Sequence, residues 1–180
     1  MLIEHNRQKL INAIIYFVTH TKSCGKIKLF KLLYFLDFEH YSRTGRSVTG
    51  LDYFAWPKGP VPTKLFNELE NPCEDFNQAF EISVKSNGML NIKPLSEFSA
   101  DYFSKRELKL LEQLANEFKN LYANHMIEAT HLENLPWHEI YEKRKLKQQQ
   151  IPYELALNKA ELEQINKNVN EHIEFKENYR

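Results

Sequence analysis

The chain has 180 residues, which favours one domain with a single hydrophobic core. Its 24 Lys and Arg residues are balanced by 24 Asp and Glu residues. A nucleic-acid binder needs an excess of cations facing phosphate, so this class is not expected, and attraction to a membrane surface is not expected either. Hydrophobic residues make up 42% of the chain and Gly contributes only five, which favours a folded, helix-rich protein over a large sheet.

Two cysteines, Cys24 and Cys73, are too few for a disulfide framework. The first residues lack the basic stretch and apolar run of a secretory signal. No segment approaches the ~18 consecutive apolar residues of a membrane span. We therefore expect a cytoplasmic protein with free thiols in a reducing compartment.

The first 41 residues predict two helices. Apolar residues at helical spacing predict a helix over residues 3–20, followed by a break at residues 23–25. The next segment, residues 26–41, is apolar on nearly every side from Ile27 to Phe38. A helix of this kind is buried against several neighbours, so we expect it to be the central helix of the core.

Residues 53–69 combine a strand, a proline-rich loop and a short helix. Residues 53–56 have the aromatic composition of a strand. Three prolines and a glycine between Pro57 and Pro62 predict an ordered, extended loop, because each proline also restricts the residue before it. Apolar residues at helical spacing over 63–69 then predict a helix directly after the loop.

A hairpin is predicted in the middle of the chain. Residues 71–78 are polar, and apolar residues then alternate over 80–84 and again over 90–92. The dipeptide Asn87-Gly88 lies between these two runs. Asn-Gly in this position favours a tight hairpin turn, in which both turn residues adopt positive φ.

The second half of the chain is predicted to be helical. Ser104 and Glu107 have the spacing of a capping box, and an apolar helical face follows over residues 108–122. Shorter helices are predicted over 126–131 and 137–144. The predicted fold class is α+β, mainly α: a helical domain with a central buried helix and a small antiparallel sheet, made of one strand plus the Asn-Gly hairpin.

A domain over residues 1–145 and a tail over residues 146–180 are the predicted units. Residues 143–150 are polar and basic, which is typical of a solvated helix end or a linker. The rest of the tail predicts a helix that packs on the same domain or on another chain, so the oligomeric state stays open. Its narrow apolar stripe consists of Leu162, Ile165, Val169 and Ile173.

The motifs of common catalytic and metal sites are incomplete. Gly45 and Gly50 have the spacing of a P-loop, but the Lys-Ser/Thr pair that should follow is absent. Glu128 and His131 lack the second Glu-x-x-His of a di-iron bundle, and neither cysteine has a Cys-x-x-Cys partner. No Arg precedes a His by four to six residues, as in many toxin-type RNases. We therefore expect no catalytic residue, no metal and no cofactor.

Two features suit a protein–protein interface. Two lysines lie three residues apart on one face of the apolar central helix, where they mark either its solvent edge or the border of a partner surface. In both cases their charges would reach water or an acidic partner. The rigid loop after the strand is either a docking element or a turn held by a core tryptophan. The candidate partner-binding residues are Lys28, Lys31, Trp56, Lys58, Pro60 and Pro62.

Four separated motifs occur in order within about residues 5–145. They are KLFKLLYF at residues 28–35, FAWPKGPVP at 54–62, FSKREL at 103–108, and ATH at 129–131 with Trp137 shortly after. Together these motifs resemble the Panacea domain, the family of SocA-like and GepA-like antitoxins. The resemblance implies an α-rich, non-enzymatic domain that neutralises a protein toxin. It does so by direct binding or, as SocA does, by handing the toxin to a AAA+ protease.

We therefore expect an antitoxin-type protein of bacterial or prophage origin that neutralises a cognate protein toxin by direct binding. The alternative is a proteolytic adaptor that delivers a client protein to a AAA+ protease. The expected partners are a toxin or client protein and, for the adaptor, the protease; no nucleic acid and no membrane are expected as partners of this chain by itself. A third interpretation, an enzyme that acts on a nucleotide or nucleic acid through a dispersed site, has only the seven histidines in its favour.

Overall fold

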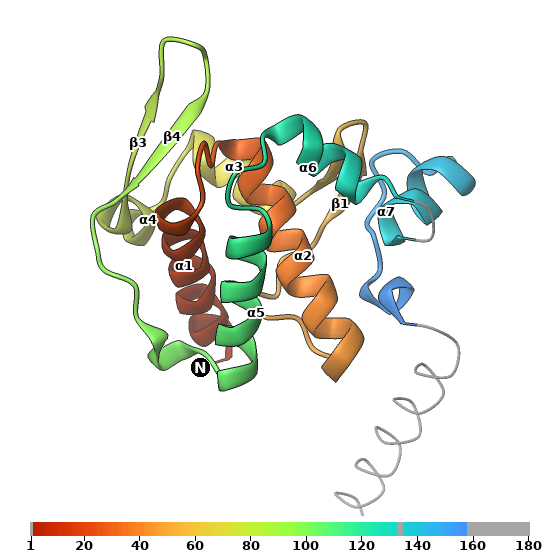
Figure 1. Cartoon of the computed structure of the whole chain (residues 1–180), viewed down its shortest axis with the longest axis horizontal. Helices are drawn as coiled ribbons and strands as arrows, with labels where there is room; N and C mark the ends of the chain where they lie inside the picture. Colours follow the sequence, from red (N-terminus) through yellow and green to blue (C-terminus); the bar gives the residue numbers. More distant parts are fainter. Residues whose placement is uncertain (1, 133–134, 158–180) are drawn as a thin grey trace, which may run out of the picture.

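The computed structural model describes residues 2–132 and 135–157. Three helices form the body of the fold: α1 (Leu2–His20), α2 (Lys26–Thr44) and α5 (Lys105–Glu117). They lie side by side and contact one another, and shorter elements cover the remaining sides of α2 (Figure 1). The mainly helical α+β class predicted from the sequence is confirmed.

The apolar segment after residue 25 forms the central helix, as predicted. Most residues of α2 between Lys28 and His40 are buried, including polar ones. Gly45 ends the helix with a φ of 69°, the left-handed conformation that glycine adopts most easily. Its backbone N–H donates to the carbonyl oxygen of Tyr41. Because protein surrounds α2, its side chains reach both the helical body and the first hairpin.

Asp37 anchors the segment that follows α2 through hydrogen bonds. Its buried carboxylate accepts hydrogen bonds from the backbone N–H groups of Val48 and Thr49 and from the hydroxyls of Thr49 and Tyr53. These donors compensate for the loss of water around the carboxylate. The network therefore sets the place where the first hairpin begins.

Two antiparallel hairpins are present where the sequence predicted one strand and one hairpin. β1 (Phe54–Trp56) pairs with β2 (Gly59–Val61), with Ala55 opposite Pro60. The expectation that the proline-rich segment runs on as an extended loop is therefore wrong, because the chain turns back on itself and pairs. β3 (Phe80–Val84) pairs with β4 (Leu90–Pro94), which confirms the predicted hairpin, and this hairpin projects beyond the helices (Figure 1).

The turn of the β3–β4 hairpin differs from the expected type. Gly88 has a φ of 78°, but Asn87 does not have positive φ. The N–H of Gly88 donates to the carbonyl of Lys85, and the N–H of Lys85 donates to the carbonyl of Met89. The hairpin is thus closed by a β-turn without positive φ at its central residues, followed by a glycine in the left-handed conformation. Only this glycine needs a positive φ.

The short helices follow the predictions except in one place. α3 (Thr63–Glu70) and α6 (Ala123–Thr130) lie where the sequence predicts helices. An unexpected helix, α4 (Glu74–Ala79), occupies the polar segment before β3. Its Phe76 is fully buried with its ring centroid 4.7 Å from that of Phe80, and Ala79 is buried too, so these two residues anchor a helix that is otherwise polar.

The N-terminus of α5 carries the predicted capping box. The Ser104 hydroxyl accepts from the N–H of Glu107, and the Glu107 carboxylate accepts from the N–H of Ser104. Lys9 of α1 also donates to the Glu107 carboxylate at 2.6 Å, so the cap joins two helices. The helix ends at Glu117, before the end of the apolar pattern at Tyr122.

The last described segment returns to the first hairpin. α7 (Pro136–His138) continues into a π-helical turn, η2 (Glu139–Lys143), and two 3-10 turns are also present, η1 (Ala100–Tyr102) and η3 (Tyr153–Ala156). Between η2 and η3 the backbone pairs with β1: Ala55 exchanges hydrogen bonds with residues 148 and 149, and Ile151 donates to Tyr53. The polar run over residues 143–150 is therefore more than a solvated linker. The predicted C-terminal helix with its apolar stripe lies outside the described residues.

Candidate functional site

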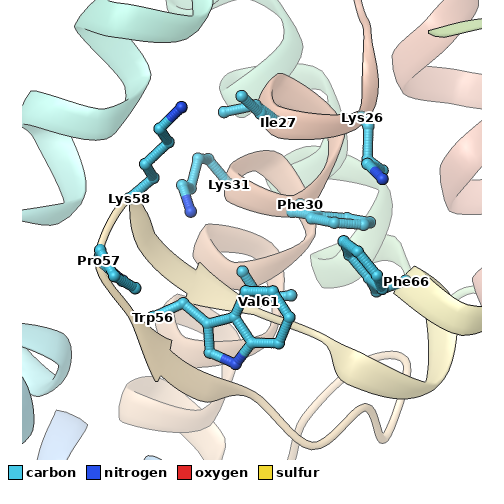
Figure 2. Close-up of a pocket in the computed structure, with 9 residues that line it drawn as sticks. All are labelled: Lys26, Ile27, Phe30, Lys31, Trp56, Pro57, Lys58, Val61 and Phe66. Carbon is cyan, nitrogen blue, oxygen red and sulfur yellow. The ribbon is translucent and has the colours of Figure 1, made fainter. Parts of the chain in front are cut away.

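An apolar groove of about 350 Å³ lies between the start of α2, the β1–β2 hairpin and α3 (Figure 2). This volume is within the range of small-ligand pockets, roughly 300–1,000 Å³. Aromatic and aliphatic side chains form the walls, three lysines join them, and no carboxylate of the described residues lines the space. The lining residues are Lys26, Ile27, Phe30, Lys31, Trp56, Pro57, Lys58, Val61 and Phe66.

Lys31 brings a buried amine to the groove. Its side chain is 1% exposed, and its Nζ donates one hydrogen bond, of 2.7 Å, to the carbonyl oxygen of Pro60. Desolvation lowers the pKa of Lys31 to about 7 from an ordinary value of 10.5. The protein therefore holds this amine close to its protonation midpoint at neutral pH.

Gly59 lets the hairpin approach Lys31 closely. Its φ of 96° is unfavourable for any side chain, and a Cβ atom built on it would lie 2.8 Å from the Lys31 Nζ and 2.7 Å from the Thr130 Oγ1. Both distances are shorter than a normal contact, so only glycine fits. The Gly-Pro pair of the loop motif thus has a steric role in placing the lysine.

Trp56 and Phe66 form the aromatic side of the groove. Trp56 is half-buried, and its ring centroid lies 5.2 Å from that of Phe66. The Nζ of Lys26 lies 4.0 Å from the Phe66 centroid, a cation–π contact, and 3.8 Å from the Glu70 carboxylate. Lys58 is exposed at the tip of the hairpin.

The last of the four sequence motifs, which contains His131 and Trp137, supports the β1–β2 hairpin. Trp137 is 1% exposed, and its indole N–H donates to the carbonyl oxygen of Trp56 at 3.0 Å. His131 stacks on Trp137 with 3.7 Å between ring centroids, and Tyr141 stacks on the same indole. Burial, and then the positive charge of Lys31, lower the pKa of His131. The motif residues from both halves of the chain therefore meet around the groove.

Lys28 is as inaccessible as Lys31 but does not line this groove. Its side chain is 0% exposed, and its Nζ donates to the carbonyl oxygens of Lys22, Lys119 and Leu121 at 2.7–3.2 Å. Burial lowers its pKa. The expectation that the two lysine charges reach water is therefore wrong, because backbone carbonyls receive them inside the protein.

The six candidate partner-binding residues thus separate into two groups. Lys31, Trp56 and Lys58 line the groove, which brings together a buried amine, an aromatic ring and an exposed cation. The other three residues, Lys28, Pro60 and Pro62, are buried and shape the structure behind it. Sequence patterns alone did not point to Phe66 or Lys26, because both lie outside the loop and are brought in by the fold.

A second charged cluster, around Arg7, was not expected from the sequence. The Arg7 guanidinium binds the Glu68 carboxylate and the Asp75 carboxylate, and it lies 3.1 Å from the Cys73 Sγ. Glu68, Cys73 and Asp75 form the group of three potential metal ligands found within the described residues, but the Arg7 guanidinium already binds both carboxylates. Desolvation and hydrogen bonds to Asp75 and Glu68 raise the pKa of the Cys73 thiol to about 11, which opposes a nucleophilic thiolate.

Comparison with known protein families identifies the family of this domain. At the level of class, the protein is a mainly helical α+β domain with an apolar groove on its surface, and no helix within its described residues has the length and apolar character needed to cross a membrane. The family model described as "Antitoxin SocA-like, Panacea domain" matches residues 29–138, more than half of the 180 residues. The chain belongs to this family, as its motifs predicted. Searches of curated proteins and of solved structures find no match.

Proposed function

We propose that this protein is an antitoxin of the bacterial cytoplasm that neutralises a cognate protein toxin by binding it, without catalysis, through the groove between α2 and the β1–β2 hairpin. The observation that carries the proposal is the origin of the groove walls. Two of the four motifs that resemble the family, at residues 28–35 and 54–62, supply most of the residues that line it, and both overlap the matched range. An antitoxin-like domain supports a role in a toxin–antitoxin pair.

The chemistry of the groove suits binding to a protein. Pairing of β1 with β2, the Trp137 hydrogen bond and the positive-φ glycine hold the hairpin in one conformation. A preorganised surface loses little entropy when a partner binds. Aromatic residues near charged ones are also the residues that contribute most to binding energy at protein interfaces.

Affinity purification of the tagged chain from its native host, with mass spectrometry, tests this proposal. We expect one protein in near-stoichiometric amount, whose expression alone arrests growth and whose toxicity is relieved by this chain. Lys58→Glu should then weaken binding at least about tenfold, because a charge at an interface rim is reversed. Lys85→Glu, on the exposed β3–β4 hairpin, is the matched control and should leave binding unchanged.

A proteolytic adaptor is the second candidate, and it needs two binding surfaces. A second hollow of about 440 Å³, which adjoins the groove at Lys26 and Ile27, lies between the β3–β4 hairpin and the start of α2, beside Val84, which is 68% exposed. One surface could hold a client and the other a AAA+ protease. The two candidates differ in one measurement: an adaptor lowers the cellular level of its partner, and deleting the protease restores it, whereas direct neutralisation leaves the level unchanged.

A further inference from the structure

Lys31 has hydrogen-bonding capacity that the described part of the chain does not use. An ammonium group carries three N–H donors, and one of them is satisfied, by the carbonyl oxygen of Pro60. Burying a cation with unmade hydrogen bonds costs free energy, so natural proteins pair such groups. Lys31 instead faces the space that lies between Trp56, Pro57 and Val61 (Figure 2).

The charges around this space have one sign. Lys26, Lys31 and Lys58 line the groove, and no carboxylate among the described residues lines it. Lys26 is partly neutralised by Glu70 at 3.8 Å, whereas Lys58 forms no ion pair with a residue of the described ranges. A ligand that enters the groove would therefore be favoured if it brought a negative charge.

The size and walls of the groove define the rest of the ligand. A cavity of roughly 150 Å³ lined by apolar side chains accepts a benzene ring. The groove, at about 350 Å³, is large enough for an aromatic or branched aliphatic side chain and a neighbouring polar group. Trp56 and Phe66 offer ring faces and edges to such a side chain.

We propose that the groove recognises an acidic–apolar segment of the partner protein, in which an aspartate or glutamate carboxylate binds the Lys31 Nζ and an adjacent aromatic or aliphatic side chain fills the space against Trp56 and Phe66. The inference rests on the proposed function and adds the chemistry of the partner. Lys58, at the rim, attracts the acidic segment, and Lys31, at the base, binds its carboxylate. A hydrogen bond between two ionised groups in a desolvated site is stronger than a neutral one, which gives the carboxylate an advantage over an amide.

The protonation of Lys31 is coupled to this event. The other titratable groups next to Lys31 are cationic or neutral: Lys26 on the same helix, Lys58 on the hairpin and His131 after α6; Glu70 beside Lys26 and Glu142, which acts on His131, do not line the groove. None of the three groups next to Lys31 supplies a negative charge, and a bound carboxylate would. Binding should therefore raise the pKa of Lys31 from about 7 and take up a proton near neutral pH.

A pair of small probes tests the inference without the partner. 3-Phenylpropionate and its neutral isostere 3-phenylpropionamide are titrated into the full chain labelled with ¹⁵N, and the indole N–H resonance of Trp56 is followed. We expect the acid to bind at least about tenfold more tightly than the amide, with the Trp56 resonance moving. In Lys31→Met, which keeps most of the length of the side chain and removes its charge, the two probes should bind alike. Lys85→Met, at an exposed lysine of the β3–β4 hairpin that does not line the groove, is the control variant, and it should keep the preference for the acid.

The outcomes decide the inference in either direction. A preference for the acid that disappears in Lys31→Met supports it. Equal binding of the two probes by the wild-type chain, binding of neither, or a preference that survives in Lys31→Met overturns it. The comparison of acid and amide on the wild-type chain remains decisive even if the variant folds poorly.

Failure of this inference can be distinguished from failure of the proposed function. If a co-purified toxin is released by Lys58→Glu while the probes show no preference for the acid, the groove binds a protein but does not select a carboxylate. If the probes behave as expected and no groove substitution changes the binding of the co-purified protein, the carboxylate site exists but is not the toxin interface.

Discussion

The surroundings of Lys28 and of Lys31 differ although both lysines lie on α2, three residues apart, and both are buried. Lys28 lies among the backbone carbonyls of Lys22, Lys119 and Leu121 and uses three donors. Lys31 lies beneath the β1–β2 hairpin, donates to one carbonyl and adjoins an open apolar groove. The same residue type in the same helix therefore has two environments.

This difference shows how to distinguish a cation with a structural role from one that is available to bind a ligand. An ammonium with all its donors used holds chain segments together, because removing it leaves carbonyls without donors. An ammonium with donors to spare gains from a ligand that supplies acceptors. Burial alone does not distinguish the two cases, but the number of hydrogen-bond acceptors around the nitrogen does.

Lys28→Met should give the largest loss of stability. Methionine fills a similar volume but cannot donate to the three carbonyls, so the free energy of unfolding should fall by about 3 kcal/mol. Urea denaturation measures this change. Lys22→Met, at an exposed neighbouring side chain, is the control and should change stability by less than about 0.5 kcal/mol. A loss below about 1 kcal/mol in Lys28→Met would mean that the carbonyls do not depend on this ammonium.

Gly59→Ala should have the next largest effect, because it pushes the hairpin away from Lys31. Its positive φ and the short distances to Lys31 and Thr130 should together cost about 2 kcal/mol. Gly88→Ala is a matched control, since Gly88 also has positive φ but a Cβ there would meet nothing within 4 Å. The control should cost about 1 kcal/mol. Equal losses in the two variants would show that contact with Lys31 and Thr130 contributes nothing.

Lys31→Met should alter the pH dependence of stability more than stability itself. The pKa of Lys31 is about 7 in the folded protein and 10.5 ordinarily, so between these values the unfolded chain binds more protons. Wild-type stability should therefore gain from this group as pH rises from 7 to 10.5, with a slope of up to about 1.4 kcal/mol per pH unit. The variant lacks this contribution, so its stability relative to wild type should decline over the same range. Parallel curves from urea denaturation across this pH range would contradict the lowered pKa.

Lys58→Met should have the smallest effect on folding. The side chain is exposed at the tip of the hairpin, so we expect the free energy of unfolding to change by less than about 0.5 kcal/mol. Thermal unfolding followed by circular dichroism is a sufficient measurement. A larger loss would mean that Lys58 stabilises the hairpin, and a loss of toxin binding in Lys58→Glu could then be an effect of misfolding.

Much of the helical architecture could be predicted because it depends on periodic apolar patterns and local capping. The apolar character of residues 27–38 identified the central helix, and the Ser104–Glu107 spacing identified the start of α5. α4 could not be predicted in this way, since a six-residue helix is too short to show a period and buries only Phe76 and Ala79. β2 was missed because a proline inside a strand, here Pro60, indicates a loop unless the partner strand is known.

Sequence analysis named some residues of the groove but not its geometry. Trp56 and Lys58 were candidate partner-binding residues, with a core position as the alternative for Trp56, and both line the groove. The burial of the two lysines was not predictable from the sequence, because their acceptors are backbone carbonyls. Such acceptors have no side-chain signature, and those of residues 119 and 121 are brought to Lys28 only by the packing of α5 on α2.

The return of the chain to β1 after η2 has a consequence for biosynthesis. The Tyr153 hydroxyl donates to the carbonyl of Leu51, across 102 residues of chain, and residues 148–151 complete the hydrogen bonds of β1. At a translation rate of roughly 5–20 residues per second, the hairpin emerges from the ribosome roughly 5–20 s before the segment that completes it. Contacts of such long range are the slow ones in folding. The groove should therefore mature only after residues 148–153 have been synthesised, so that a nascent chain without this segment is not yet competent to bind a partner.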